Sequence, residues 1–165
     1  MTDAPRPAVR KRRLGTEQKA HLVASAMNLA NLATLAYSSE DPDYPIENIL
    51  NAGSPEWRAA VPGVTEELVI EFDEPQSFNR LVYEVRETEA RRAQEIQIDA
   101  SDDNCRSFRQ LLVQEFTFSP DGATFQREDL HVLAEAITHL RLVIIPNKQG
   151  SGVASLMTLY LFQGS

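Results

Sequence analysis

The sequence has little of what several protein classes need. Among its 165 residues there is one cysteine, Cys105, so no disulfide can form within the chain. A single thiol is typical of a reducing compartment, and we expect a cytoplasmic protein. No apolar run approaches the roughly 20 residues that a membrane helix needs. No apolar segment follows the basic N-terminus in the manner of a secretory signal.

The sequence also lacks the residue patterns that carry catalysis. It has three histidines, and they show neither His-x-His nor His-x₃-His spacing. There is no Gly-rich phosphate loop and no G-x-S-x-G motif. The acidic loop with Glu40, Asp41 and Asp43 does not match the calcium pattern D-x-[DN]-x-[DN]-G. We therefore predict no enzyme activity, no cofactor and no metal site.

Charge is distributed unevenly along the chain. Residues 1–15 hold five basic side chains and one acidic one, a charge of +4, which leaves −12 for the remainder because the total is −8. An acidic body repels phosphate backbones, so the protein is not an all-over nucleic-acid binder. We expect residues 1–15 to form a flexible basic arm, because like charges repel and Pro5 and Pro7 break helices. That arm is either a solvated tail or a docking element.

Beyond the arm, hydrophobic residues first recur about every fourth position and then, from about residue 31, every second position. Thr16 and the spacing of Leu22, Ala26 and Leu29 predict an N-terminal helix over residues 16–29. Residues 30–165 then alternate in the manner of strands separated by Pro, Gly and Asp turns. We also expect a helical turn near residues 46–50 and a buried Trp57. The predicted strands are 32–37, 67–73, 81–85, 95–100, 112–118, 125–132, 140–144 and 154–162. About eight strands without long helices between them predict an all-β antiparallel sandwich or jelly roll.

Two loops carry candidate binding residues. Tyr44 lies in an acidic, proline-flanked loop, where an aromatic ring stacks on a ligand or covers the edge of the core. The second loop runs from Arg86 to Arg92 and holds three arginines and two glutamates. Arginine forks suit carboxylates and phosphates, although this loop could also neutralise itself as a solvated hairpin tip.

The order of short motifs resembles the discoidin, or coagulation factor 5/8 type C, family. The run NLATLAYSSEDPDYPIENILNAGSPEWRAA is similar to the start of such a domain, and ELVIEFDEPQSFNRLVYEV is similar to its next two strands. The matching residues are Ser38, Ser39, Tyr44, Pro45, Glu47, Asn48, Trp57, Phe72, Asp73, Pro75 and Gln76. The resemblance covers about residues 29–163 and implies a galactose-binding-like β-sandwich. Asn51-Ala52-Gly53 replaces the family's Asp-Gly, which argues against its calcium site.

Within that family, the sequence resembles intracellular members such as the amino-terminal domain of the single-strand-break repair scaffold protein. The resemblance implies a non-catalytic module that docks on a partner protein in a multi-subunit assembly, or assembles with itself. The expected docking residues are Arg10, Lys11, Arg12, Arg13, Leu22, Ala26 and Leu29.

Two other functions stay open. In a carbohydrate-binding module, sugar hydroxyls would contact Tyr44, Glu87, Arg91 and Arg92. In a repair scaffold, the basic residues between 6 and 13 would contact nucleic acid. The shape of the surface at the loop ends distinguishes carbohydrate binding from protein docking. A sugar site needs a concave pocket with an aromatic residue, whereas docking needs a flatter apolar patch.

Overall fold

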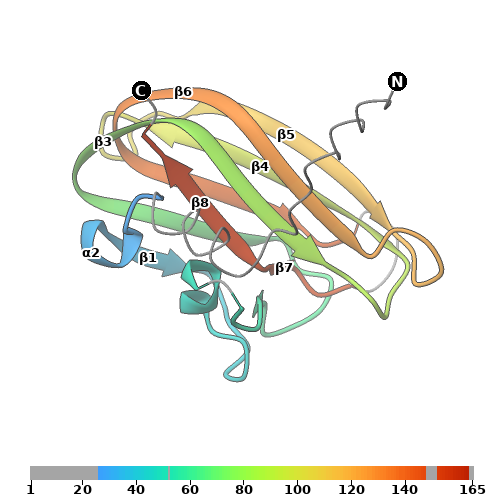
Figure 1. Ribbon diagram of the computed structural model, residues 1–165. Coiled ribbons are helices and arrows are strands. Elements are labelled where there is room, and N and C mark those ends of the chain that lie inside the picture. The colour runs from blue at the N-terminus through green and yellow to red at the C-terminus, as the bar shows by residue number, and fades with distance from the viewer. Residues whose placement is uncertain (1–25, 52, 148–151, 164–165) are drawn as a thin grey trace, which may run out of the picture.

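The computed structural model describes residues 26–51, 53–147 and 152–163. In these ranges it has one short α-helix, one 3-10 turn and eight strands (Figure 1). They are α2 (Leu29–Leu32), β1 (Ala33–Tyr37), η1 (Ile46–Leu50), β2 (Trp57–Arg58), β3 (Glu66–Arg86), β4 (Arg92–Ser101), β5 (Arg109–Phe118), β6 (Phe125–Ile145), β7 (Ser155–Leu156) and β8 (Thr158–Phe162). The predicted arm, residues 1–15, and most of the predicted helix, residues 16–29, lie outside the described residues.

The start of the described chain differs from the predicted helix. Residues 26–28 are not helical, and α2 begins at Leu29, where the prediction had the helix end. Asn28 caps α2, because its side chain accepts a hydrogen bond from the backbone N–H of Asn31. Leu29 is only 3% exposed and belongs to the hydrophobic core. Leu29 therefore packs inside the domain.

The strands form an antiparallel sandwich built on two long strands. The main sheet has the order β1-β3-β6-β4-β5, β8 pairs with β3, and β2 pairs with β7 as a separate ribbon. β3 and β6 pair along most of their length, from Glu66 opposite Ile144 to Arg86 opposite Phe125. The first half of β3 and the second half of β6 lie in the layer with β1 and β4. The second half of β3 and the first half of β6 lie in the layer with β8.

Each of these long strands was predicted as two shorter ones. The polar stretch around Pro75 suggested a break, but the chain bends there while it keeps its partner strand. The pairing shifts register between Glu71 and Arg80, and Ala136 in β6 has a positive φ of 48°. Such bulges increase the local twist and let one strand serve both layers. Figure 1 shows both strands curving at the left-hand end of the molecule.

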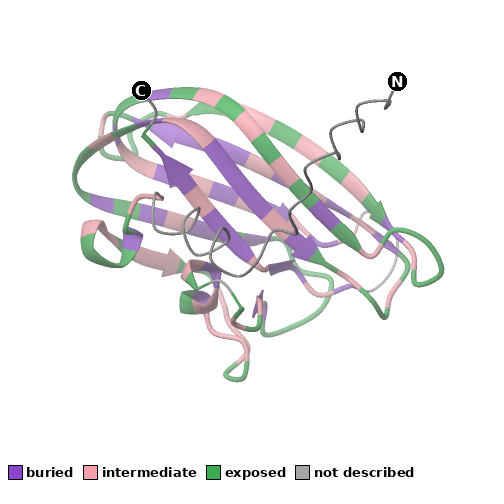
Figure 2. Ribbon diagram, viewed as in Figure 1, coloured by how far each residue is buried: buried purple, intermediate pink, exposed green. Residues whose placement is uncertain are grey.

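The core lies between the two layers and follows the predicted alternation. Inward residues such as Leu68, Ile70, Ile98 and Leu142 are almost fully buried. Trp57 is fully buried, as predicted, and its indole N–H donates to the carbonyl of Ser39 at 3.0 Å. Figure 2 shows buried residues alternating with more exposed ones along the strands, and further exposed residues in the loops. The sandwich predicted from the strand pattern is confirmed.

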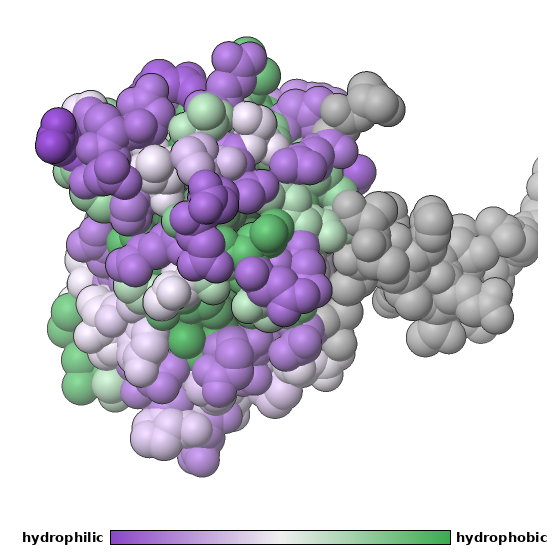
Figure 3. Space-filling view, turned by 90° about the vertical axis from the view of Figure 1, so that its left-hand side faces the viewer, coloured by the Kyte–Doolittle hydropathy of each residue, from purple (hydrophilic) through white to green (hydrophobic). Residues whose placement is uncertain are grey.

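Hydrophilic side chains cover most of the end that α2 occupies. Figure 3 shows this end, where hydrophobic side chains are scattered among the hydrophilic ones, with larger groups near the centre and at the lower left edge. The opposite end carries the loop between β3 and β4, and β7 of the β2–β7 ribbon lies along the lower side of the molecule (Figure 1).

Candidate functional site

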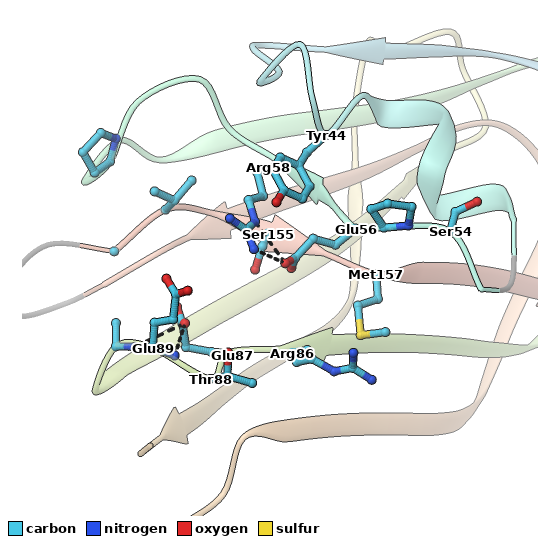
Figure 4. Close-up of a pocket in the computed structure, with 15 residues that line it drawn as sticks. Tyr44, Ser54, Glu56, Arg58, Arg86, Glu87, Thr88, Glu89, Ser155 and Met157 are labelled. Atoms are coloured by element: carbon cyan, nitrogen blue, oxygen red, sulfur yellow. Dashed lines mark hydrogen bonds and ion pairs between the residues drawn. The ribbon is translucent and has the colours of Figure 1, made fainter. Parts of the chain in front are cut away.

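A cavity of about 510 Å³ opens beside the β2–β7 ribbon. Four chain segments surround it: the loop that holds Tyr44, the residues around β2, the loop after β3, and the chain from residue 152 to residue 157 (Figure 4). It is lined by Tyr44, Ser54, Pro55, Glu56, Arg58, Pro62, Arg86, Glu87, Thr88, Glu89, Ala90, Gly152, Val153, Ser155 and Met157. Residues far apart in the sequence therefore converge on one concave surface.

Tyr44 and Arg58 form one wall of the cavity. The Arg58 guanidinium lies 4.0 Å from the centre of the Tyr44 ring, a cation–π contact. The backbone joins the same two residues, because the Arg58 N–H donates to the Tyr44 carbonyl at 3.1 Å. An isolated bridge between Asp41 and Tyr44 closes the loop. The Tyr44 ring is therefore held in place, with Arg58 against one of its faces.

Glu56 is the most buried acid in this wall. Its side chain is 12% exposed, and its Oε1 accepts hydrogen bonds from Arg58, at 3.0 Å from Nε and 2.9 Å from an Nη. Its Oε2 is buried and has no hydrogen-bond partner among the described residues. Burial raises the pKa of Glu56, and the hydrogen bond from Arg58 offsets only part of that rise.

The opposite wall is the loop after β3, and Glu87 determines its shape. One carboxylate oxygen of Glu87 accepts from the backbone N–H groups of Glu89 and Ala90. The other accepts from Arg92 Nε at 2.6 Å. Burial is the largest single influence and opposes ionisation, but the hydrogen bonds from Arg92, Glu89 and Ala90 and the charge of Arg92 together lower the pKa of Glu87. Glu87 is held by these bonds, so Thr88 and Glu89 are the exposed polar groups that this loop contributes to the cavity.

Arg92 lies beneath the cavity. Its side chain is 1% exposed, so the guanidinium does not line the cavity. One Nη donates to Gln94 and to the Pro146 carbonyl, and the other donates to Ser155. The sequence predicted a ligand contact for Arg92, whereas the structure uses it to fix Glu87 and the cavity floor.

The other predicted site residues fall in different places. Tyr44 and Glu87 line the cavity, but Arg91 is 71% exposed, pairs with Asp121 at 3.2 Å and does not line it. Among the predicted docking residues, Leu29 is in the core and Ala26 is half-buried. The remaining docking residues, Arg10, Lys11, Arg12, Arg13 and Leu22, lie outside the described residues.

Sequence reasoning missed the acidic and basic residues on either side of Trp57. Side chains alternate along a strand, so a buried Trp57 sends Glu56 and Arg58 together to the opposite side. That signal was available in the sequence. The approach of this pair to residues 86–90 was not, because it depends on how the β2–β7 ribbon closes the sandwich.

The acidic loop does not gather carboxylates around a metal. Glu40 accepts a hydrogen bond from the backbone N–H of Ile46 at 2.8 Å, and Asp41 accepts one from Asp43 at 2.9 Å. In the part of the chain that the structure describes, no three His, Cys, Asp or Glu side chains cluster as metal ligands would. No helix within that part has the length and apolarity needed to cross a bilayer.

The fold agrees with those of solved carbohydrate-binding proteins. CpGH89CBM32-5 from Clostridium perfringens, solved in complex with GalNAc-β-1,3-galactose, superposes with a TM-score of 0.60 at 20% identity, over 84% of this chain and 99% of that one. CBM32-3 from a family 31 glycoside hydrolase of the same organism gives 0.63 at 18% identity, over 86% and 96%. Chitosan-binding module 1 from a Paenibacillus sp. IK-5 chitosanase/glucanase gives 0.58 at 19% identity, over 82% and 98%.

Sequence comparison gives the family directly. No curated protein sequence matches the chain. The comparisons do not support the predicted closer resemblance to the intracellular repair scaffold. The family described as the F5/8 type C domain matches residues 34–159, most of the chain. With the sandwich fold in agreement, this protein belongs to the F5/8 type C domain family.

Proposed function

We propose that this protein is a non-catalytic carbohydrate-binding module whose site is the cavity beside the β2–β7 ribbon. The observation that carries the proposal is the concave shape of this surface, with Tyr44 in its wall. A concave pocket with an aromatic residue is what separates a sugar site from a flat protein-docking patch. Its volume of about 510 Å³ suits a ligand the size of one or two sugar rings.

The chemistry of the lining suits sugar hydroxyls. A hydroxyl both donates and accepts, so it pairs with a carboxylate on one side and a guanidinium on the other. The cavity offers both kinds of group at its rim, in Glu89 and Arg86, together with the hydroxyl of Thr88. The Tyr44 ring, which lines the cavity, provides an apolar contact for the C–H groups of a sugar ring.

The similar structures support the same choice. Their descriptions name GalNAc-β-1,3-galactose, galactose and chitosan as ligands of sandwich domains with this fold. Docking on a protein partner was our main prediction from the sequence. It depends on residues 1–29, most of which lie outside the described residues, so docking and the nucleic-acid alternative stay predictions. The cytoplasmic location also stays a prediction.

Isothermal titration of the full chain with galactose, N-acetylgalactosamine and short chitosan oligomers tests the proposal. We expect saturable one-to-one binding of at least one sugar, weakened about tenfold in Tyr44→Ala by loss of the ring contact. Tyr37→Ala is the matched control, because Tyr37 is 46% exposed on β1 and does not line the cavity. Binding that Tyr37→Ala weakens as much as Tyr44→Ala does would contradict the site.

A further inference from the structure

We propose that residues 16–25 pack, within the same chain, on the outer face of the layer formed by β8, the second half of β3 and the first half of β6. Residues 16–25 lie outside the described ranges and join them at Ala26. The outer face is the side of this layer turned away from the core, and it carries Val82, Glu84, Thr158, Tyr160 and Phe162. None of these five residues lines the carbohydrate cavity, so this is a second, separate surface.

The outer face holds buried hydrophobic side chains that do not belong to the core. Leu81, Tyr83 and Leu161 point into the core, so the side chains next to them in each strand point outward. Val82 is nevertheless only 1% exposed, and Phe162 only 8%. Within the described ranges, they are the only buried hydrophobic residues outside the core. A second group of apolar side chains is therefore shielded from water on the outside of the sandwich.

A buried hydroxyl without a partner lies beside them. Tyr160 is opposite Val82 in the β3–β8 pairing, so its ring lies on the same outer face. Its hydroxyl oxygen is buried and has no hydrogen-bond partner among the described residues. Buried tyrosine hydroxyls usually have one. The nearby Arg80 does not serve, because it covers the Phe162 ring at 4.7 Å and donates to Asp129. The missing partner points to a group outside the described residues.

The described chain begins at the edge of this face. The backbone N–H of Met27 donates to the Leu161 carbonyl at 2.8 Å, which places Met27 beside β8. Ala26 and Met27 line a second cavity, of about 260 Å³, together with Tyr160. In Figure 1, β8 lies toward the viewer, and no described helix or strand crosses in front of it. The residues before Ala26 therefore start where the outer face has no described cover.

Residues 16–25 have the length needed to cover the face. Ten residues of helix are about 15 Å long, and a five-residue strand such as β8 spans about 16 Å. A helix this short is marginal in water unless a surface buries one of its sides. The segment and the face therefore match in size, and each lacks a cover without the other.

The sequence pattern of the segment also fits a sheet face. At about 100° per residue, one broad side of the predicted helix carries the apolar residues Ala20, Leu22, Val23 and Ala24. The opposite side carries the polar residues Glu17, Gln18, His21 and Ser25. Thr16 and Lys19 fall on the apolar side, where either one could donate a hydrogen bond to the Tyr160 hydroxyl.

Tethering favours the chain's own segment over that of a second copy. Residue 25 adjoins Ala26 at the edge of the face, so the local concentration of the segment is roughly millimolar or more. A separate molecule has to reach that concentration to compete. Leu22 is then covered by its own domain, and only residues 1–15 are left for docking on a partner.

A nitroxide spin label at position 18 tests the contact. Gln18 lies on the polar side of the predicted helix, and Cys105→Ser leaves Gln18→Cys as the only thiol of the full chain. We expect the label to remove most of the amide NMR signal of Val82, Asp129 and Tyr160. The amides of β5, which lies at the far edge of the other layer, should keep theirs.

A mixed sample separates the chain's own segment from that of a second copy. Chains that carry the spin label but no ¹⁵N are mixed with ¹⁵N-labelled chains that carry no spin label. We expect the outer-face amides to keep their signal in this mixture, because each face is covered by its own segment.

Two aspartate substitutions test the contribution to stability. Val23→Asp places a charge at the centre of the apolar side and should lower the melting temperature by about 5 °C or more. His21→Asp is the matched control on the opposite side of the predicted helix, and it should change the melting temperature by less than about 1 °C.

The proposal is overturned if the spin label at position 18 leaves the outer-face amides unchanged. Loss of those signals in the mixed sample also overturns it, because the occupant is then a second copy. Equal melting temperatures of Val23→Asp and His21→Asp contradict it as well. Sugar titrations of the same chains are a separate measurement, so the proposed carbohydrate function can fail without this contact failing, and the reverse.

Discussion

Replacement of Arg92 should destabilise the fold rather than simply remove a ligand contact. The Arg92 side chain is 1% exposed, and Glu87, its ion-pair partner, is 17% exposed. Arg92→Met would leave Glu87 without its cation and would remove the donors to Gln94, the Pro146 carbonyl and Ser155. Breaking a buried ion pair from one side costs about 3–5 kcal/mol. Domains of this size are stable by about 5–15 kcal/mol in total.

We expect a value near the lower end of that range, about 3 kcal/mol, because Glu87 keeps two backbone N–H donors in the variant. Arg92→Lys should cost less than Arg92→Met but more than 1 kcal/mol, because an ammonium cannot reproduce the forked guanidinium contacts. Urea denaturation, followed by tryptophan fluorescence of the buried Trp57, measures both values.

The neighbouring arginine provides the control. Arg91 is 71% exposed and pairs with Asp121, which is 80% exposed, so Arg91→Ala should change the stability by less than about 0.5 kcal/mol. If Arg92→Met were equally mild, the buried network would not stabilise the fold. The sequence-based reading of Arg92 as a ligand contact would then regain support.

Three further predictions concern the stability of the fold and the pKa of Asp103. Trp57→Ala should lower the free energy of unfolding by about 3–5 kcal/mol because Trp57 is fully buried, and a thermal shift of only a degree or two would contradict this. Gly152→Ala should destabilise by about 1–3 kcal/mol in a urea titration, because the added methyl would lie 2.5 Å from the Cδ of the immobile Arg92, and an unchanged midpoint would show that Arg92 can move. Hydrogen bonds from Ser107 and Ser101 lower the pKa of Asp103 to about 2, so its stabilising contribution should be complete above the ordinary carboxyl pKa of about 4 and be lost as the pH falls toward 2. Carboxyl NMR titrations should show this low pKa and its rise in Ser107→Ala, and an ordinary pKa in the parent chain would refute the assignment.

The sandwich was predictable because its strands alternate strictly. The inward series of Ile96, Ile98 and Ala100 depends only on the two-residue period of a strand, and all three are buried. The number of separate strands was harder to predict from the sequence. The sequence around Pro75 looks like a turn, but bulges carry β3 and β6 through it. Whether a polar stretch reverses the chain or bends it depends on the partner strand, which local sequence does not specify.

The site was only partly predictable for a related reason. Tyr44 and Glu87 could be identified because their loops have unusual composition. Arg91 and Arg92 look alike in the sequence, yet one is exposed and the other is buried. The difference is set by strand phase at the start of β4 and by partners more than fifty residues away, such as Pro146 and Ser155.

The most direct test of the central claim is an amide NMR titration of the full chain with galactose, N-acetylgalactosamine and a glucosamine trimer in turn. If the cavity is the carbohydrate site, at least one sugar should shift the amides of its lining, among them Tyr44, Arg58, Thr88 and Glu89. The loop at residues 102–108, which contributes nothing to this cavity, should stay unchanged. The claim is contradicted if no sugar shifts the lining amides, or if the shifts cluster on that loop instead.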